Sequence, residues 1–332
     1  MSENLPSVTI IIAARPDQAE IEAVKAAWRF DYPPGLIEVI VARGIQPSVQ
    51  RNAAMKAARG EWIYFLDDDS VAPAGNLRQA AKSFADPAVK MVGGPNLCPP
   101  GAPLLEQVFA VVLASWLAFG PSRARYAPVG QTRETGEKEL ILCNLLARRD
   151  AMLELGGFNE ALYPNEENAL MDELQKRGGK LIYDPRVVVY RRPRRSLSSF
   201  ARMLLTYGRG RAEQFRLHPT FGSALNFVPP LFCLYLLALL AFAGFAAGGP
   251  LASFRLWAAA PLALYGAAII WQTFVSAFTA GPARSLLALP LLAASHVLYG
   301  LGIWRGLFTV LPRGGSRRKA SHFEVVLETV PR

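Results

Sequence analysis

The stretch Phe65-Leu66-Asp67-Asp68-Asp69-Ser70 decides how the rest of this sequence is interpreted. The apolar run from Trp62 to Leu66 predicts a buried strand, which stops at three consecutive aspartates. On an extended chain Asp67 and Asp69 project to the same side, so two carboxylates converge at the carboxyl end of the strand. Carboxylate oxygens suit Mg²⁺ or Mn²⁺, and ligands usually bind at this edge of an open α/β sheet. The pattern favours a metal site that carries a diphosphate, although acidic clusters after strands also cap turns.

Strand-like and helix-like segments alternate on the amino-terminal side of this stretch. The β-branched run from Val8 to Ile12 predicts a first strand, and a helical segment is expected from Gln18 to Arg29. The run from Ile37 to Val41 predicts a second strand, and Ser48 is a suitable N-cap for a helix from Val49 to Ala58. Such alternation predicts a parallel sheet in an α/β fold.

Three short motifs together resemble the signature of glycosyltransferase family 2. They are Arg51-Asn52-Ala53-Ala54, Ala58-Arg59-Gly60-Glu61 and Asp67-Asp68-Asp69, in the order and spacing of that family. The resemblance implies a GT-A fold, the Rossmann-like α/β domain of transferases that use nucleotide-diphospho-sugars. It implies that Asp69, together with Asp67, binds Mg²⁺ or Mn²⁺. It also implies a set of residues that contact the donor, namely Ala14, Arg15, Asp17, Arg51, Asn52, Asp67 and Asp68.

A second acidic block follows a glycine-rich turn. Gly156-Gly157-Phe158-Asn159-Glu160 precedes Asn165-Glu166-Glu167-Asn168-Ala169-Leu170, and family 2 enzymes carry a similar turn and acidic pair. The resemblance gives Glu167 the position of the catalytic base, with Glu166 as a supporting residue or as the base if the register differs by one. An acceptor hydroxyl must lose its proton as it attacks the anomeric carbon, and a carboxylate within hydrogen-bond distance can take it. Alternatively, the acidic residues of this segment are a solvated helix face.

The segment Cys143-Asn144-Leu145-Leu146 predicts a short strand before a helix that begins at Arg148-Arg149. It resembles the part of the family that lines the acceptor side, which makes Asn144 an expected acceptor ligand. The three cysteines, Cys98, Cys143 and Cys233, are scattered and imply neither a disulfide framework nor a metal site.

Nine arginines lie between residues 186 and 216, and they account for much of the net charge of +10. Together with Glu-Glu-Asn and the run Tyr207-Gly208-Arg209-Gly210-Arg211, they resemble the branch of family 2 that builds lipid-linked exopolysaccharide, typified by succinoglycan β-1,3-glucosyltransferase. Guanidinium groups suit phosphate, while juxtamembrane arginines also meet anionic headgroups. No aromatic-interleaved basic element indicates nucleic acid as a partner. The residues expected to contact acceptor or phosphate are Arg191, Arg192, Arg194 and Arg195.

The composition becomes apolar near residue 222. Uncharged runs extend from Asn226 to Ser253, from Leu256 to Ala283 and between Arg284 and Arg305. Each is about as long as the 20 or so apolar residues that cross a bilayer. No signal peptide is recognised at the start, so the catalytic part is expected in the cytoplasm of a multi-pass protein of the inner or plasma membrane. The expected domains are a GT-A domain (1–221, with a basic juxtamembrane segment from 186), two or three membrane helices (222–310) and a basic polar tail (311–332).

The number of crossings depends on the third apolar run. It contains His296 and Gly300-Leu301-Gly302, and three crossings would put the basic tail opposite the catalytic domain, against the positive-inside rule. A re-entrant or interfacial helix is therefore the alternative. His296 is expected to pack between helices, with a functional role at that depth as the alternative. A further apolar stretch from Leu104 to Gly120 suits either an interfacial helix or a buried core helix.

The sequence differs from the family in the residues that are expected to bind the donor. The second strand ends Val41-Ala42-Arg43-Gly44, without the aspartate that reads the uracil of UDP in many members. Base recognition is then left to backbone groups, Asp17, Arg51 or Asp67. The Gln-x-x-Arg-Trp motif of processive synthases is also absent, which predicts transfer of one sugar per cycle.

The resemblance thus implies a membrane-anchored, metal-dependent, inverting hexosyltransferase. It would move one sugar from a nucleotide-sugar, with UDP-hexose as the expected donor, to a lipid-linked or glycan acceptor in polysaccharide or glycolipid synthesis. Two alternatives stay open. Asp67-x-Asp69-x-Val71 also fits a haloacid-dehalogenase phosphatase, although that pattern normally ends the first strand of its domain. The non-enzymatic alternative is a membrane scaffold with a catalytically decayed transferase domain.

Overall fold

The computed structural model describes residues 5–160, 165–217, 219, 226–245, 254–310 and 324–332. The chain divides into two compact units. The first, called here the sheet unit, comprises residues 1–101, 121–192 and 312–332, and the second, the helical unit, comprises residues 102–120 and 193–311.

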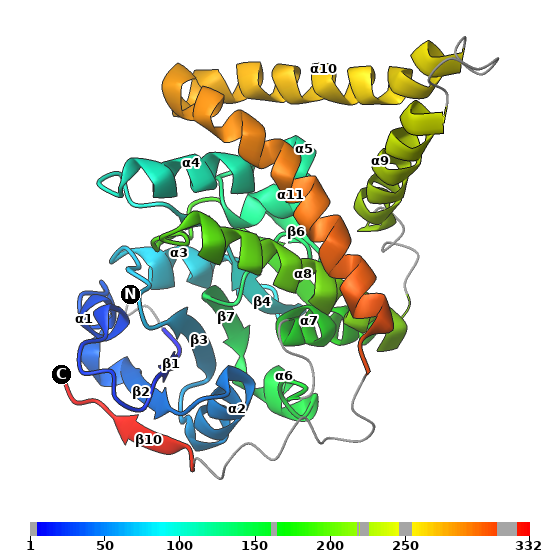
Figure 1. Ribbon diagram of the computed structural model, residues 1–332. Helices are drawn as coiled ribbons and strands as arrows, with labels where there is room; N and C mark the ends of the chain where they lie inside the picture. The colour runs from blue at the N-terminus through cyan, green and yellow to red at the C-terminus, as the bar shows by residue number, and fades with distance from the viewer. Residues whose placement is uncertain (1–4, 161–164, 218, 220–225, 246–253, 311–323) are drawn as a thin grey trace. The chain divides into compact units, whose positions relative to one another are not determined.

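An eight-stranded mixed sheet forms the centre of the sheet unit, with the strand order β10-β2-β1-β3-β7-β4-β8-β6 (Figure 1). β1 pairs in parallel with both β2 and β3, so the carboxyl ends of these three strands lie at one edge. β7 is antiparallel to β3 and to β4, and β4 is parallel to β8. The strands are β1 (Val8–Ala14), β2 (Ile37–Arg43), β3 (Trp62–Asp67), β4 (Val89–Gly93), β6 (Arg133–Thr135), β7 (Asn144–Arg148), β8 (Lys180–Tyr183) and β10 (Val326–Thr329). A small parallel sheet joins β5 (Asn96–Leu97) and β9 (Val189–Tyr190).

Alternate residues of the parallel strands face two separate hydrophobic cores. Ile10 and Tyr64 belong to one core, while their neighbours Ile11 and Phe65 belong to the other, as the two-residue period of a strand requires. The first core is completed by α1 (Glu22–Ala27) and α3 (Asn76–Ser83), and the second by α2 (Pro47–Ala57), α6 (Arg149–Glu154) and α7 (Glu166–Lys176). The short 3₁₀ helices are η1 (Pro34–Leu36) and η2 (Gly120–Arg125). This three-layer arrangement confirms the predicted α/β class.

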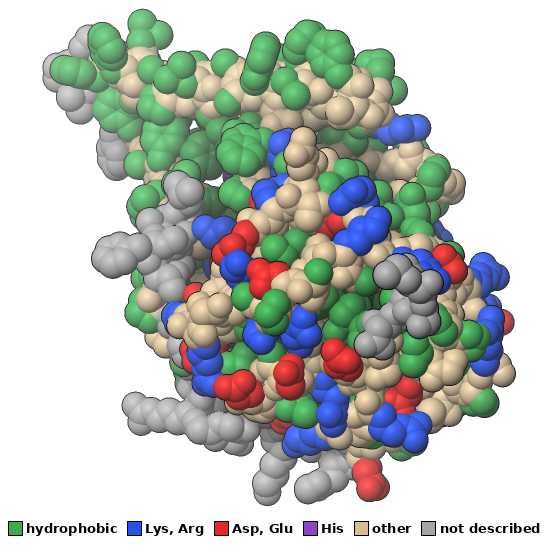
Figure 2. All heavy atoms as spheres, turned by 180° about the vertical axis from the view of Figure 1, so that it is seen from behind, with side chains coloured by type: hydrophobic (Ala, Val, Ile, Leu, Met, Phe, Trp, Pro, Cys, Tyr) green, Lys and Arg blue, Asp and Glu red, His purple; other side chains and the backbone are tan. Residues whose placement is uncertain are grey.

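The helical unit has an apolar surface on its longest helices. Large side chains such as Trp257 and Phe278 are 79% and 77% exposed, and Figure 2 shows hydrophobic side chains gathered over α10. Soluble proteins rarely expose apolar surface on this scale. By length and composition α10 and α11 could each cross a membrane, and a third span would arise if two helices bent by 59° (Leu104–Leu113 and Trp116–Arg125) count as one. The helices are α4 (Leu104–Leu113), α5 (Trp116–Phe119), α8 (Leu197–Leu217), α9 (Val228–Phe245), α10 (Arg255–Ala280) and α11 (Pro282–Phe308).

The third apolar run differs from the re-entrant helix considered above, because it forms the continuous helix α11 of 27 residues. Its glycines are sites of close packing. A Cβ on Gly300 would lie 2.6 Å from the Pro229 carbonyl oxygen, and one on Gly302 would lie 2.3 Å from that of Leu205. Glycine at such contacts lets helix backbones approach closely. His296 hydrogen-bonds the Tyr265 hydroxyl through Nδ1 (2.8 Å) and the Leu117 carbonyl through Nε2 (2.9 Å), which confirms its packing role.

Several boundaries in the sheet unit also differ from expectation. α1 covers only Glu22–Ala27, and Ser48 lies inside α2 rather than at its N-cap. α2 begins at Pro47, whose fixed φ suits the first helical position, and Gln46 takes the N-cap position without a side-chain bond.

The terminal residues do not form a polar tail throughout. Residues 324–332 contribute β10, which pairs antiparallel with β2, while the basic residues from 313 to 319 lie outside the described part of the chain. Residues 102–120 and 193–217 group with the apolar helices rather than with the sheet. For the second of these segments the close approach of α8 to α11 explains the grouping, since Gly208 on α8 leaves no room for a Cβ next to the Tyr299 carbonyl.

Candidate active site

The aspartate cluster lies at the carboxyl edge of the three parallel strands. Asp67 is the last residue of β3, and the chain then turns, with the Ser70 amide donating to the Asp67 carbonyl at 3.0 Å. The extended geometry expected for Asp67 and Asp69 is therefore wrong. The two carboxylates nevertheless converge, because both bind the guanidinium group of Arg191.

Arg191 is held in place by the strand that precedes it. Tyr190 exchanges two backbone hydrogen bonds of 2.9 Å with Val71, and the Arg191 amide donates to the Leu97 carbonyl at 3.0 Å. These contacts bring the Arg191 side chain to the aspartates, where Nη1 lies 3.0 Å from Asp67 Oδ2 and Nε bonds Asp69 Oδ1. Burial raises the pKa of Asp69, and the positive charge of Arg191 offsets part of that rise.

Arg51 connects the aspartates to the second acidic block. It projects from α2 and is 7% exposed, with Nη2 2.9 Å from Asp67 Oδ1 and Nη1 3.4 Å from Glu166 Oε1. Carboxylates and guanidinium groups therefore alternate along one chain of contacts, in the order Glu166, Arg51, Asp67, Arg191, Asp69. We call these five residues the acidic network. Pairing of this kind is what allows charged groups to be buried.

The two glutamates at the start of α7 have different surroundings. Glu166 is 2% exposed, and its Oε2 accepts from the Asn165 amide at 3.2 Å. Burial, followed by the charge of Glu167, raises the pKa of Glu166 to about 7, while Arg51 acts in the opposite direction. Glu167 is half-buried and has no ion-pair partner within the described residues. An acidic group whose pKa lies near neutrality is typical of functional sites.

Asn52 fixes the glycine-rich turn rather than presenting a free amide. Its Nδ2 donates to the Phe158 carbonyl and to Glu160 Oε1, both at 2.9 Å, and its Oδ1 accepts from the Phe158 amide at 2.8 Å. Gly157 has φ +82°, and a Cβ there would lie 2.5 Å from Asn52 Oδ1. The turn therefore requires glycine and rests on α2.

Asn144 is a core residue in the structure. It is fully buried, its Oδ1 accepts from the Tyr64 hydroxyl at 2.8 Å, and its Nδ2 donates to the Val187 carbonyl at 2.7 Å. These contacts replace the acceptor contact that the sequence suggested, because the side chain points into the protein from β7.

The other predicted residues are not members of the acidic network. Ala14 is buried, and its carbonyl accepts from the Gly44 amide at 3.1 Å and from Gln50 Nε2 at 2.8 Å. The Asp68 carbonyl accepts from the Ala23 amide, which joins this turn to α1. The remaining residues are exposed: Arg15 and Asp17 after β1, Arg192 in the sheet unit, and Arg194 and Arg195 in the helical unit.

One charged group at this edge was missed by sequence reasoning. The Arg43 guanidinium at the end of β2 lies 3.0 Å, through Nε, from Glu328 Oε2 on β10. The sequence contains no local signal for this pair, since 285 residues separate its members. The only available hint was the apolar run of residues 325–327 next to Glu328, which is compatible with a strand.

The aspartates fit a divalent metal ion that is bound only partly by protein. No group of three or more His, Cys, Asp or Glu side chains within the described residues could hold a metal ion. Asp67 and Asp69 supply two carboxylates, and the guanidinium between them shows that both can face one cation. Mg²⁺ is commonly bound by one or two carboxylates, with its other positions taken by substrate phosphates and water.

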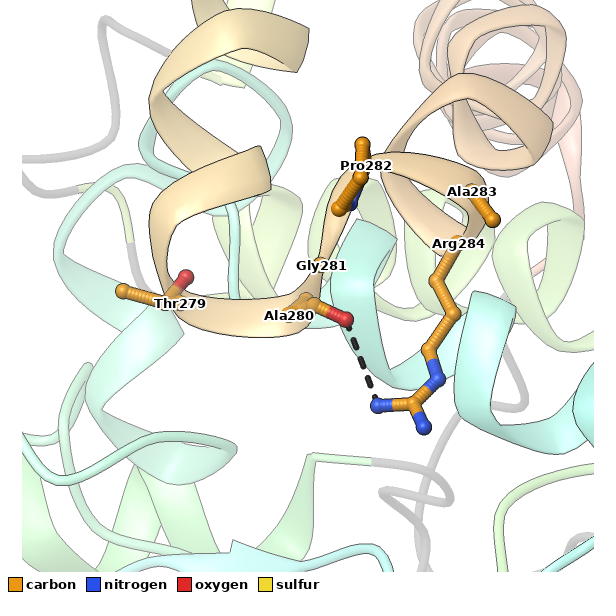
Figure 3. A pocket seen from close by; sticks show the side chains of 6 residues that line it. All are labelled: Thr279, Ala280, Gly281, Pro282, Ala283 and Arg284. Atoms are coloured by element: carbon orange, nitrogen blue, oxygen red, sulfur yellow. Dashed lines mark hydrogen bonds between the residues drawn. The ribbon is translucent and has the colours of Figure 1, made fainter.

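A shallow pocket also lies at the turn between α10 and α11 (Figure 3). It is lined by Thr279, Ala280, Gly281, Pro282, Ala283 and Arg284, and Arg284 Nη1 donates to the Ala280 carbonyl at 3.2 Å. None of its six lining residues is a carboxylate or a nucleophile suited to catalysis, so the carboxyl edge of the sheet remains the candidate active site.

An α/β sheet with this acidic network at its carboxyl edge defines a transferase domain of the GT-A class. A family model described as "Glycosyltransferase like family 2" matches residues 1–205, which is more than half of the chain. The chain therefore belongs to glycosyltransferase family 2, as its motifs predicted. This assignment does not favour the haloacid-dehalogenase alternative.

Individual relatives are distant. The succinoglycan biosynthesis protein ExoA of Rhizobium meliloti is 26% identical over 211 residues, which cover 62% of this chain and 58% of that protein. A pre-mycofactocin glycosyltransferase of Mycobacterium tuberculosis is 28% identical over 177 residues, covering 52% of this chain and 36% of that protein. The chain thus spans less than two thirds of these relatives. Among solved structures, the mannosyltransferase PcManGT from Pyrobaculum calidifontis, in complex with GDP-Man and Mn²⁺, has a TM-score of 0.57 at 21% identity over 87% of each chain, a likeness of fold.

Proposed function

We propose that this protein is a membrane-anchored, inverting hexosyltransferase that uses a nucleotide-sugar donor and a lipid-linked or glycan acceptor. The observation that carries the proposal is the acidic network at the carboxyl edge of β1 and β3, whose member Glu166 lies next to Glu167 at the start of α7. Two of the proteins named above support the proposal. One takes part in succinoglycan biosynthesis, and the other, the mannosyltransferase, binds GDP-Man and Mn²⁺. Exopolysaccharide or glycolipid synthesis is the process in which we expect the chain to act.

The donor diphosphate binds at the aspartates in this proposal. Asp69 and Asp67 would hold Mg²⁺ or Mn²⁺, and such an ion would supply positive charge that stabilises the leaving nucleoside diphosphate. Arg191, which pairs with both aspartates, has a guanidinium group that could instead donate hydrogen bonds to the diphosphate oxygens of a bound donor. Arg51 keeps Asp67 in place from the opposite side through its bond of 2.9 Å.

Glu167 is the proposed catalytic base. Its carboxylate takes the proton of the acceptor hydroxyl, whose oxygen forms a bond to the anomeric carbon from the face opposite the donor phosphate. The bond between that carbon and the phosphate oxygen breaks, its electron pair leaves with the nucleoside diphosphate, and the configuration is inverted. Glu166 supports the base through its charge and is the alternative base, although its bond to Arg51 occupies one oxygen.

The helical unit is the proposed anchor. α10 and α11 have the length and composition of membrane helices, which supports a multi-pass protein of the inner or plasma membrane with a cytoplasmic sheet unit. A bilayer would present a lipid-linked acceptor to such an enzyme. Arg192, Arg194 and Arg195 are the proposed contacts to its phosphate or to anionic headgroups.

The test is donor turnover by the full chain in detergent. UDP-, GDP- and dTDP-hexoses are incubated with the protein, a lipid extract as acceptor, and Mn²⁺, Mg²⁺ or EDTA, and the nucleotide released is measured. We expect metal-dependent release from one donor, lost in Asp69→Asn and retained in Asp172→Asn, a control on the outer part of α7 where Asp172 pairs with Lys176.

Two results would contradict the proposal. Hydrolysis of simple phosphate esters without use of any nucleotide-sugar would indicate a phosphatase. Failure to bind any nucleotide in a direct titration would indicate a scaffold.

A further inference from the structure

The last described strand of the chain pairs with β2, a strand whose carboxyl end lies at the edge that carries the candidate active site. β10 runs antiparallel to β2, with Val326 opposite Arg43 and Glu328 opposite Val41. Figure 1 shows β10 beside β2, close to the C-terminus. Because the two strands run in opposite directions, the beginning of β10 lies at the carboxyl end of β2, which is the edge that carries the candidate active site.

Glu328 contacts the loop after β1 through one intermediary. Its Oε2 accepts from Arg43 Nε at 3.0 Å. Arg43 Nη1 donates to the Gln18 carbonyl at 2.7 Å and to the Arg15 carbonyl at 3.4 Å. The guanidinium group of Arg43 therefore joins β10, the end of β2 and the loop that follows β1. Arginine suits such a position because its planar group carries several N–H donors in a fixed geometry.

The loop that Arg43 holds follows the carboxyl end of β1. From β1 the chain crosses to β2 on one side, and β3 lies on the other, so the strand order reverses next to β1. Ligands bind outside the carboxyl ends of the strands at such a switch point. A donor with its diphosphate at Asp67 and Asp69 would extend its nucleoside toward residues 15–18, which follow the neighbouring parallel strand β1.

We propose that the C-terminal strand is part of the donor site: Glu328 positions Arg43, and Arg43 holds residues 15–18 as the wall that faces the nucleoside of a nucleoside diphosphate. This inference rests on the proposed function and assigns its nucleoside subsite. Unlike many family members, this chain has no acidic residue at the end of β2. The carboxylate of Glu328, 285 residues away from Arg43 in the sequence, lies at this end of β2 instead. Both side chains are positioning residues.

The exposure of the pair indicates that its role is positioning rather than stability. The Glu328 side chain is 50% exposed and that of Arg43 is 22% exposed. Exposed ion pairs contribute about 0–1 kcal/mol to the free energy of unfolding. The contacts of Arg43 with two loop carbonyls, in contrast, set where the backbone of residues 15–18 lies, and that position matters when a ligand binds against it.

Nucleotide binding and the ordering of β10 should favour each other. If an ordered β10 favours nucleotide binding, then bound nucleotide must favour an ordered β10 to the same extent. Amide hydrogen exchange of residues 326–329 should therefore slow when UDP, or whichever nucleoside diphosphate the chain prefers, is added. Inorganic pyrophosphate should not slow it, because pyrophosphate has no nucleoside.

The test uses the full chain in detergent with Glu328→Gln and Arg43→Lys. We expect the preferred nucleoside diphosphate to bind about fivefold more weakly in each variant, which corresponds to about 1 kcal/mol. The KM for the nucleotide-sugar rises by the same factor with kcat within about twofold. Affinity for pyrophosphate stays at the parental value. Glu328→Asp restores part of the loss, and Glu324→Gln, the same change of charge just before the strand, has no effect.

Three other results would contradict the inference, and they can be told apart. Parental nucleotide affinity in both variants, with exchange of β10 unaffected by nucleotide, would remove it while leaving the transferase in place. An equal loss for pyrophosphate, or a lowered melting temperature that accounts for the loss, would show a structural role only. Absence of nucleotide binding by the parent chain would refute the proposed function, and the inference with it.

Discussion

Two groups of charged side chains border the carboxyl edge of the parallel strands, and they differ in burial. In the acidic network the side chains of Arg51 and Glu166 are 9% and 3% exposed, whereas Glu328 in the Arg43 pair is 50% exposed. Removing one partner from a buried pair costs about 3–5 kcal/mol, and an exposed pair contributes about 0–1 kcal/mol. The Arg51–Glu166 end of the acidic network should therefore tolerate only changes that preserve shape. The Arg43 pair, and Asp69 with a side chain that is 45% exposed, can be altered with less effect on folding.

The largest effect is expected for Asp69, the most exposed carboxylate of the acidic network. Asp69→Asn keeps the shape of the side chain but removes a charge that the metal ion needs. Turnover should fall about a thousandfold, in line with the several kcal/mol that a metal ion supplies to such transition states. Mn²⁺ binding, followed by electron paramagnetic resonance in the presence of nucleoside diphosphate, should weaken in parallel. Normal Mn²⁺ binding by the variant would contradict the metal assignment.

A large loss confined to kcat is expected for Glu167→Gln. General bases typically contribute about 10²–10⁴-fold, so the variant should lose at least a hundredfold in kcat with little change in the KM for the donor. Glu166→Gln is the matched control, since it makes the same change one residue earlier. If Glu166→Gln shows the larger loss in kcat, the roles of the two residues are exchanged, and near-normal turnover of both variants would defeat the assignment of a base to this segment.

The sequence predicted the parts of this edge that depend on local patterns. Strands β1, β2 and β3 each include the predicted run and extend one or two residues beyond it, because a β-branched or apolar run with a clear end is a local signal. The convergence of Asp67 and Asp69 was also predicted, but for an incorrect reason. The chain turns after Asp67, and Arg191, 122 residues from Asp69, draws the two carboxylates together.

What the sequence could not provide was the direction of individual polar side chains. Asn52 and Asn144 lie in the expected elements, yet each uses its amide to bond other parts of the protein. Whether a polar residue near a strand end faces a ligand or the core depends on which distant segments pack against it. The same limit hid Glu328, whose partner strand is set by a pairing that spans nearly the whole chain.

Replacing Arg191 should change the affinities for metal ion and for nucleotide in opposite directions, because its guanidinium lies where the metal ion is proposed to bind. Arg191→Gln removes the competing positive charge, so Mn²⁺ should bind more tightly to the variant in the absence of nucleotide. Affinity for the nucleoside diphosphate should fall about tenfold, as expected for a lost charge-assisted hydrogen bond of about 1.5–3 kcal/mol. Arg186→Gln is the control, because Arg186 pairs with Asp184. Weaker Mn²⁺ binding without nucleotide would show that Arg191 supports the metal site instead of competing for it.

A smaller effect concerns stability, and its sign follows from the raised pKa of Glu166. Burial lifts that pKa from 4.5 to about 7, with Glu167 adding to the rise and Arg51 opposing it. The folded protein thus binds a proton that the unfolded chain has released at the same pH, and stability falls as the pH rises from about 4.5 to 7. Glu166→Gln, which cannot ionise, should reduce this slope in melting experiments between pH 5 and 8. An unchanged slope would mean that Arg51 compensates the charge of Glu166 fully.

The smallest effect is the coupling between the two groups. None of the bonds described above joins the acidic network to the Arg43 pair, and changes at sites without shared partners usually add to within about 0.5 kcal/mol. The double variant Arg191→Gln, Glu328→Gln should therefore lose the product of the two single factors in affinity for nucleoside diphosphate. This outcome would mean that the diphosphate and nucleoside subsites act independently. A double variant that binds as well as Arg191→Gln alone would show that the loop of residues 15–18 adapts when the diphosphate contact is lost, and that the nucleoside subsite depends on it.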